Sequence, residues 1–232
     1  MLIDVLRTLA AGRDTFIRHL CISSLLRRLD ARTVLDVGGE GCMNIFAGQA
    51  KVTTVNIRSG RGVDHVIAGD RLPFAEGSFD AVISVDTLEH LAKGDRPGFI
   101  QEMARVAGKG VILCAPLGTP EHIKYEKHLL ANGKLPESDA EYLKEHIDNG
   151  LPTPQEVDEL AKLYSGKLFF QGDFRGLGKA PRGRLRSLSG NIFANLGLVI
   201  FWGNGKLFEY EFTPYTNRFF LVVEKQLPKA AN

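Results

Sequence analysis

The fold of this chain is decided by the stretch TVLDVGGEG, residues 33–41. Its first five residues are apolar or β-branched apart from Asp36, as in a strand that is buried on both faces of a parallel sheet. The glycines that follow allow a tight turn at the end of that strand. We therefore predict a buried strand at 33–37 that runs into a glycine-rich turn.

Strand and helix patterns alternate on both sides of this stretch. Apolar residues recur at helical spacing within 15–29 and 95–106. Parallel neighbouring strands need long crossovers, which right-handed helices usually supply. The alternation therefore predicts an α/β fold, with a mostly parallel sheet covered by helices on both faces. Besides 33–37, the strands expected in its first half are 52–57, 63–67, 79–85 and 110–114.

The C-terminal part adds one clear helix and two strands. The residues TPQE, 153–156, place a capping threonine before a proline and a glutamate, which predicts a helix that runs to about Tyr164. The segments 167–170 and 219–224 read as strands without a simple helical crossover between them. We therefore expect a seven-stranded sheet in which the last strand lies antiparallel beside its neighbour.

The length and composition indicate an ordinary globular protein. A chain of 232 residues fits a single domain, here with a helical lead-in over 1–30 and insertions at about 117–152 and 175–214. The net charge of +2 is too small for a nucleic-acid binder that works by bulk charge. Three scattered cysteines favour thiols in a reducing compartment. With no apolar run long enough for a transmembrane helix and no signal-peptide core, we predict a cytoplasmic location.

Within the second insertion, a basic run precedes the apolar stretch 192–202. Three uses are open: a helix that packs in the core behind a solvated basic segment, a patch for an anionic substrate, or an interfacial segment that includes 182–202.

A longer series of motifs follows the first glycines in order. It consists of GDRLPF at 69–74, GSFDAVIS at 77–84 and LEHL at 88–91. Together with 33–41, this series resembles the class I S-adenosylmethionine-dependent methyltransferases of the small-molecule type, over roughly residues 33–116. The resemblance implies a Rossmann-like fold, S-adenosylmethionine as cofactor, and methyl transfer to a small-molecule or glycan-like acceptor. The stretch EHIDNGLP, 145–152, is similar to a segment of methyltransferases that act on glycans and other polar metabolites.

The resemblance also implies a set of cofactor-binding residues. The first acid and its glycines match the part that holds the methionine end, and Asn56 stands where the family usually has an acid on the ribose hydroxyls. Residues 70–72 match the adenine end, and Asp86 follows the fourth strand, at the edge where open α/β sheets bind ligands. The full set is Asp36, Gly38, Gly39, Gly41, Asn56, Asp70, Arg71, Leu72 and Asp86.

Two features depart from the family pattern. Glu40 and Cys42 occupy the second and third glycine places of a G-x-G-x-G series that starts at Gly38. The turn is either obstructed there or shifted by one residue, with Gly39 and Gly41 as the positions of close approach. Asn56 in place of an acid loses a charge-assisted hydrogen bond, which is worth about 1 kcal/mol.

Methyl transfer is an in-line displacement, so the protein mainly supplies alignment, and a base is needed only for an acceptor with a tightly held proton. His90 and His146 are the candidate bases, although a structural role is open for both. No two histidines have a ligand spacing such as HExxH, so no metal site is predicted. Two rival functions are a non-catalytic scaffold that has lost the cofactor, and an NAD-linked enzyme, for which the third glycine and the acid are missing.

Overall fold

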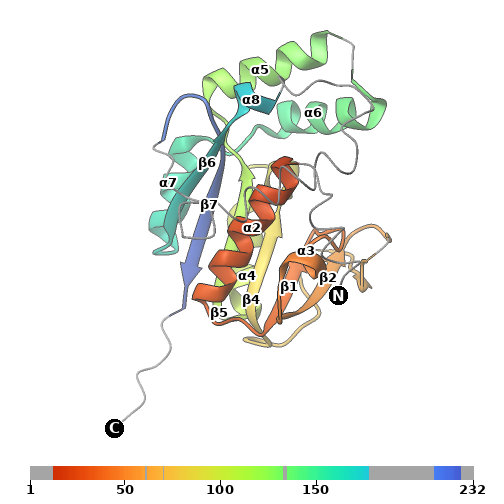
Figure 1. Ribbon diagram of the computed structural model, residues 1–232, viewed down its shortest axis with the longest axis vertical. Helices are drawn as coiled ribbons and strands as arrows, with labels where there is room; N and C mark the ends of the chain where they lie inside the picture. Colours follow the sequence, from red (N-terminus) through yellow and green to blue (C-terminus); the bar gives the residue numbers. More distant parts are fainter. Residues whose placement is uncertain (1–12, 61, 70, 133–134, 178–211, 226–232) are drawn as a thin grey trace.

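A computed structural model describes residues 13–60, 62–69, 71–132, 135–177 and 212–225, and the fold is given for these ranges (Figure 1). They form one seven-stranded sheet with the strand order β3-β2-β1-β4-β5-β7-β6. Strand β7 is antiparallel to β5 and to β6, and the other pairings are parallel. The predicted fold class, a mostly parallel seven-stranded sheet with an antiparallel last strand, is confirmed. The strands are β1 (Thr33–Val37), β2 (Lys51–Asn56), β3 (His65–Val66), β4 (Phe79–Val85), β5 (Ala107–Pro116), β6 (Lys167–Asp173) and β7 (Thr216–Glu224).

The strands agree with the predicted ranges to different extents. Strands β1 and β4 have the predicted bounds, because their mostly apolar runs end at Gly38 and at Asp86. Strand β5 is longer than predicted, since it pairs along its length with β4 on one side and β7 on the other. Strand β3 has only two residues and pairs with β2 alone at the edge of the sheet.

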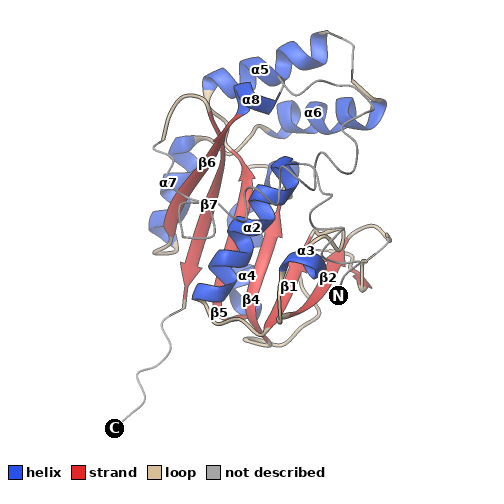
Figure 2. Cartoon of the chain, in the orientation of Figure 1, coloured by secondary structure: helices blue, strands red, loops and turns tan. Residues whose placement is uncertain are grey.

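Helices cover both faces of the sheet (Figure 2). Helices α2 (Arg13–Arg28) and α3 (Met43–Phe46) pack on one face, and α4 (Arg96–Val106) and α7 (Pro154–Leu163) pack on the other. Successive residues of β1 alternate between the two cores, as the pleat of a strand requires: Val34 joins α2, while Leu35 joins α4. The sheet is therefore buried on both sides, as its apolar strands predict.

The first insertion forms a helical cap at the end of the sheet. It contains α5 (Pro120–Ala131) and α6 (Glu137–Asn149), and the short α8 (Phe174–Leu177) lies beside α5 (Figure 1). The cap lies beyond the carboxyl ends of β4 and β5, where the 3₁₀ helix η1 (Leu88–His90) also begins. Helix α6 contacts η1 directly.

Much of the second insertion, 178–211, lies outside the described residues, so the three uses of its basic and apolar segments stay predictions. No helix in the described ranges is long and apolar enough to cross a membrane.

A buried ion pair ties the cap to the sheet. Thr153 caps α7 as predicted, because its hydroxyl accepts a hydrogen bond from the backbone N–H of Glu156 at 3.2 Å. The Glu156 carboxylate is directed to Arg96, whose Nη1 lies 2.8 Å from Oε1. Arg96 is 1% exposed and also donates to the carbonyls of Leu88 and Gly150. This one guanidinium therefore joins η1, the end of α6 and the start of α7.

Replacing Arg96 should destabilise the fold strongly. Arg96→Met leaves the Glu156 carboxylate buried without its partner, which typically costs about 3 to 5 kcal/mol of unfolding free energy. Urea denaturation measures the loss. The double variant Arg96→Met/Glu156→Leu should regain part of it, because no buried charge then remains. A single variant as stable as the wild type would contradict this role.

Candidate active site

The turn after β1 packs closely against neighbouring residues of the protein. Gly38 has a φ of +81°, in the left-handed region that favours glycine, and its N–H donates to the carbonyl of Val55 at 2.8 Å. A Cβ atom at Gly38 would lie 2.3 Å from Thr87 Oγ1, and one at Gly39 would lie 2.0 Å from Asp36 Oδ2. These two glycines are therefore required by internal packing, whatever ligand approaches them.

A glycine is also required at position 41 by close packing within the protein. Its φ is +77°, and a Cβ atom there would lie 2.8 Å from Gly62 Cα. A bulky substitution in this turn would therefore disturb the fold, and loss of binding in such a variant would not locate the ligand.

Asp36 presents an unsatisfied acceptor beside this turn. The residue is 3% exposed, and its Oδ1 has no hydrogen-bond partner. Burial raises the pKa of the carboxyl from 3.8 to about 7. A buried carboxylate oxygen without a partner is costly, and a cationic ligand group beside it would remove that cost. Asp36 therefore fits the ammonium of an amino-acid ligand.

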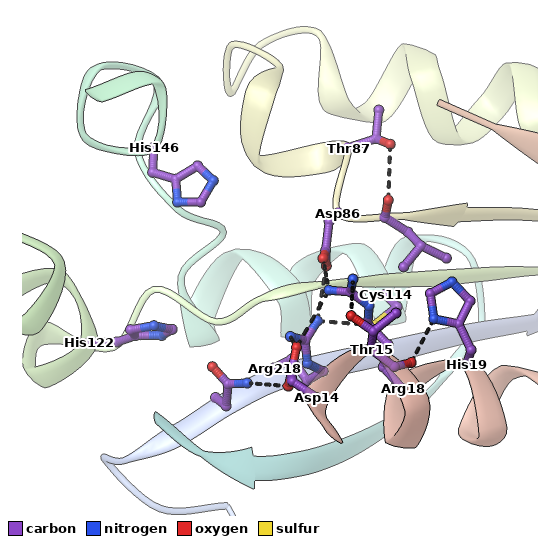
Figure 3. A network of polar contacts seen from close by, with 12 residues as sticks. Asp14, Thr15, Arg18, His19, Asp86, Thr87, Cys114, His122, His146 and Arg218 are labelled. Carbon is purple, nitrogen blue, oxygen red and sulfur yellow. Dashed lines mark hydrogen bonds and ion pairs between the residues drawn. The ribbon is translucent and has the colours of Figure 1, made fainter. Parts of the chain in front are cut away.

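Asp86 stands at the end of β4 with a φ of +50° and is the centre of an ion cluster (Figure 3). Arg218 donates to its Oδ1 at 2.9 Å, and Arg18 donates to its Oδ2. Arg218 also donates to Asp14 at 2.8 Å. Burial alone would raise the pKa of Asp86, but the two guanidinium groups hold it below its usual value. Both carboxylate oxygens of Asp86 are thus already bound within the protein.

Helix η1 brings a second buried carboxylate and a histidine to the same edge. Glu89 is 1% exposed, its Oε2 has no hydrogen-bond partner, and burial raises its pKa well above the usual value. The next residue, His90, is partly exposed, and its Nδ1 lies 2.6 Å from Oε2 of Glu145 on α6. Burial lowers the pKa of His90.

His146, one residue further along α6, faces the same place. Its ring centre lies 5.2 Å from that of His90. Its Nδ1 lies 3.1 Å from Oε1 of Glu126 on α5. Another histidine of the cap, His122, is buried, stacks on Phe174 with ring centres 4.5 Å apart, and contacts a backbone carbonyl through Nδ1. His90 and His146 are therefore a pair, whereas His122 is part of the core of the cap.

These groups surround one cavity of about 360 Å³ at the carboxyl end of β1 and β4. The glycine turn and Asp36 form one wall, and η1 with α6 forms another. The cavity is lined by Arg18, His19, Asp36, Gly38, Gly39, Glu40, Cys42, Val85, Asp86, Glu89, His90, Pro116, Tyr142 and His146.

Six of the residues predicted from the sequence meet at this cavity: Asp36, Gly38, Gly39, Asp86, His90 and His146. Of the other predicted residues within the described ranges, Gly41, Asn56, Arg71 and Leu72 are not part of its lining. Asp70 lies outside the described residues.

The positions of Asn56 and Leu72 have clear structural reasons. Asn56, the last residue of β2, donates from Nδ2 to the carbonyls of Gly38 and Gly39, at 3.0 Å each, and so supports the turn. An acid could not donate these bonds. Leu72 is 5% exposed and belongs to the core on the α4 side.

Beside Glu40 and Cys42, which the sequence marked as departures from the family pattern, the polar lining residues that sequence reasoning did not single out are Arg18, His19, Glu89 and Tyr142. Arg18 and His19 lie in α2, far from the motifs in sequence. Burial and the nearby Arg18 lower the pKa of His19 to about 4, and its Nδ1 lies 2.7 Å from the carbonyl of Thr15. Glu89 was within the LEHL motif, and an acid inside an apolar motif was the available signal.

Comparisons with known proteins give one family match and several solved structures of similar fold. A family model described as a methyltransferase domain matches residues 42–115. No curated protein sequence matches the chain. This match indicates a methyltransferase domain over that part of the chain.

Among solved structures, the chain is similar to an S-adenosylmethionine-dependent methyltransferase from Archaeoglobus fulgidus (16% identity, 89% of this chain and 94% of that chain, TM-score 0.50). It is also similar to the plantazolicin methyltransferase BpumL in complex with S-adenosylhomocysteine (12% identity, 97% of this chain and 96% of that chain, TM-score 0.56). A third similar structure is that of geranyl diphosphate C-methyltransferase from Streptomyces coelicolor A3(2) (10% identity, 88% of this chain and 78% of that chain, TM-score 0.51). At these identities the likeness concerns the fold.

The raised pKa of Asp36 predicts a pH-dependent stability of the ligand-free protein. Between about pH 4 and pH 7 the folded state keeps a proton on Asp36 that the unfolded state has lost. The contribution of this group therefore lowers the unfolding free energy as the pH rises through that range, by roughly 3 to 5 kcal/mol, and is constant above it.

Asp36→Asn should remove this contribution. Urea denaturation of the wild type and the variant at pH 5 and pH 8 measures the difference. The unfolding free energy of the variant, relative to that of the wild type, should be higher at pH 8 than at pH 5. An identical pH dependence in the two proteins would mean that Asp36 is not a desolvated carboxyl.

Proposed function

We propose that this protein transfers the methyl group of S-adenosylmethionine to a small-molecule or glycan-like acceptor in the cavity between the glycine turn and the helical cap. One observation carries the proposal: Asp36, whose Oδ1 has no hydrogen-bond partner, lines the same cavity as His90 and His146. Each of these two histidines contacts a carboxylate through Nδ1. When bound, the cofactor supplies an electrophilic methyl group on a sulfonium.

The wall formed by β1 would hold the methionine end of the cofactor. Asp36 would accept from the ammonium, and the backbone of Gly38 and Gly39, which lines the cavity, would lie along the carboxylate. Asn56, by bracing those two residues, would act as a positioning residue for the turn. Gly41, Asp70, Arg71 and Leu72 stay proposals for the rest of the cofactor site, and Asp86 would hold the framework around it.

The wall formed by η1 and α6 would receive the acceptor. In a neutral histidine whose Nδ1–H donates to a carboxylate, Nε2 carries the free lone pair. His90 and His146 both have this arrangement, through Glu145 and Glu126. Either histidine would therefore be able to take the proton of an acceptor hydroxyl as the methyl group arrives.

The acceptor class rests on the polarity of this wall. Glu89, His90, Tyr142 and His146 line the acceptor side of the cavity, which suits a molecule with several hydroxyl groups. The similarity of 145–152 to segments of glycan-directed methyltransferases points the same way, because α6 carries His146. A cytoplasmic location stays a prediction, as does a contact of 182–202 with a membrane surface.

The rival function is a methyltransferase-like scaffold without a cofactor. Glu40 and Cys42 favour it, since both line the cavity in the places of two family glycines. The packing around the turn weakens this alternative: the fold already accommodates Glu40 and Cys42 while it keeps Asp36 unsatisfied.

Calorimetric titration with S-adenosylhomocysteine separates the two functions. The wild type should bind with a micromolar dissociation constant, and Asp36→Asn should weaken binding by about 10-fold to 100-fold through loss of a charge-assisted hydrogen bond. Binding at pH 6.5 should also release a proton from Asp36, which makes the measured heat depend on the buffer.

Asp80→Ala is the matched control. Asp80 accepts from the backbone N–H groups of Arg32 and Thr33, at the start of β1 and away from the cavity, so this variant should lose stability and keep its affinity. A wild type that binds neither S-adenosylmethionine nor S-adenosylhomocysteine would favour the scaffold, and equal losses of affinity in the two variants would remove Asp36 from the site.

A further inference from the structure

We propose that Glu89, His90 and His146 bind a divalent transition-metal ion of the kind represented by Zn²⁺ and Mn²⁺. One potential ligand atom from each of the three side chains lies within 4.8 Å of the other two. All three residues line the cavity, so a bound ion would face the space in which an acceptor is proposed to lie. The ligands come from η1 and α6, which are distant in sequence and are brought together by the cap.

The histidines have the second contact that metal-bound histidines usually have. A histidine ligand commonly donates its other ring N–H to a carboxylate, which fixes the tautomer and the ring orientation. Here Nδ1 of His90 lies 2.6 Å from Glu145, and Nδ1 of His146 lies 3.1 Å from Glu126. These contacts leave Nε2 of each ring as the ligand atom.

Glu89 supplies an independent observation. Its side chain is buried, with the residue 1% exposed, and Oε2 has no hydrogen-bond partner. Buried carboxylate oxygens in folded proteins are nearly always hydrogen-bonded or bound to a cation. The two nearby guanidinium groups, of Arg18 and Arg218, are already directed to Asp86. A metal ion beside the histidines would satisfy this oxygen.

The ligand types select the class of ion. Two imidazoles and one carboxylate suit Zn²⁺, Mn²⁺ or Fe²⁺, whereas Mg²⁺ and Ca²⁺ prefer sites made of oxygen atoms. Three protein ligands next to a cavity also leave a coordination position open, as in catalytic zinc sites. Ligand atoms at about 2.1 Å from an ion lie roughly 3 Å apart, so small side-chain movements would close the present arrangement.

The metal site does not depend on the cofactor, although it lies in the same cavity. With an ion bound, His90 and His146 would be ligands and would no longer accept a proton. The ion would then take over the polarisation of an acceptor oxygen. The two roles of the histidines make opposite predictions about metal removal: activity would survive a chelator if they are bases and would be lost if they are ligands.

The test uses the full chain, freed of metal by dialysis against a chelator and kept without cofactor. Calorimetric titration with Zn²⁺ and visible absorption of added Co²⁺ should both indicate one ion per chain. Mg²⁺ should bind at least 10-fold more weakly than Zn²⁺. Glu89→Gln, His90→Ala and His146→Ala should each reduce Zn²⁺ affinity by 10-fold or more.

Two further variants keep the result unambiguous. Glu145→Gln changes only the partner of a ligand and should weaken binding by about 10-fold while the fold is kept. His128→Ala replaces an exposed histidine of α5 and should leave Zn²⁺ binding unchanged. A protein that binds no Zn²⁺, or binds it equally in the wild type and in His90→Ala and His146→Ala, would overturn the proposal.

A parallel titration of the metal-free protein with S-adenosylhomocysteine separates this inference from the proposed function. Cofactor binding without Zn²⁺ binding would overturn the metal site alone. Zn²⁺ binding without cofactor binding would leave the metal site in place and contradict the methyltransferase proposal.

Discussion

The ion cluster around Asp86 is the interaction on which the cavity depends. Asp86 ends β4 in the left-handed region of φ, and its carboxylate is held by Arg18 from α2 and Arg218 from β7. The Asp86 carboxylate is partly exposed, whereas its partner Arg218 is buried, so removing the carboxylate would leave a buried guanidinium with one partner fewer. The cluster thus couples the first helix and the antiparallel strand to the point where the chain turns into η1, and so sets the position of Glu89 and His90.

The sheet could be predicted from the sequence, because its signals are local. The runs at 33–37 and 79–85 are mostly apolar and end at a glycine or an acid, so β1 and β4 have the predicted bounds. The antiparallel direction of β7 could be predicted because no simple helical crossover precedes this strand in the sequence. The site was predictable only in part: the roles of Asp36 and the glycines were inferred from a motif, but the meeting of His90 with His146 arises from the packing of α6 on η1. Sequence spacing also could not indicate a metal site whose ligands come from two separate elements.

The cavity combines two chemically different walls. One is made of backbone and a single desolvated carboxyl, Asp36, which suits a charged amino-acid group. The other is made of imidazoles held by carboxylates, which suits proton transfer or metal binding. Asn56 stands where the methyltransferases that this chain resembles usually have an acid, and its amide supports the turn by donating to the carbonyls of Gly38 and Gly39. The buried Arg96 joins η1 to α6 and α7 and so keeps the second wall in place.

The most direct test of the account is a crystal structure of the protein with S-adenosylhomocysteine. The account predicts that the ammonium of the ligand lies within hydrogen-bond distance of Asp36, that its carboxylate lies along Gly38 and Gly39, and that its sulfur faces the wall that carries His90 and His146. A ligand bound away from Asp36, or one whose sulfur points away from the two histidines, would contradict the proposed site even though the fold is that of a methyltransferase.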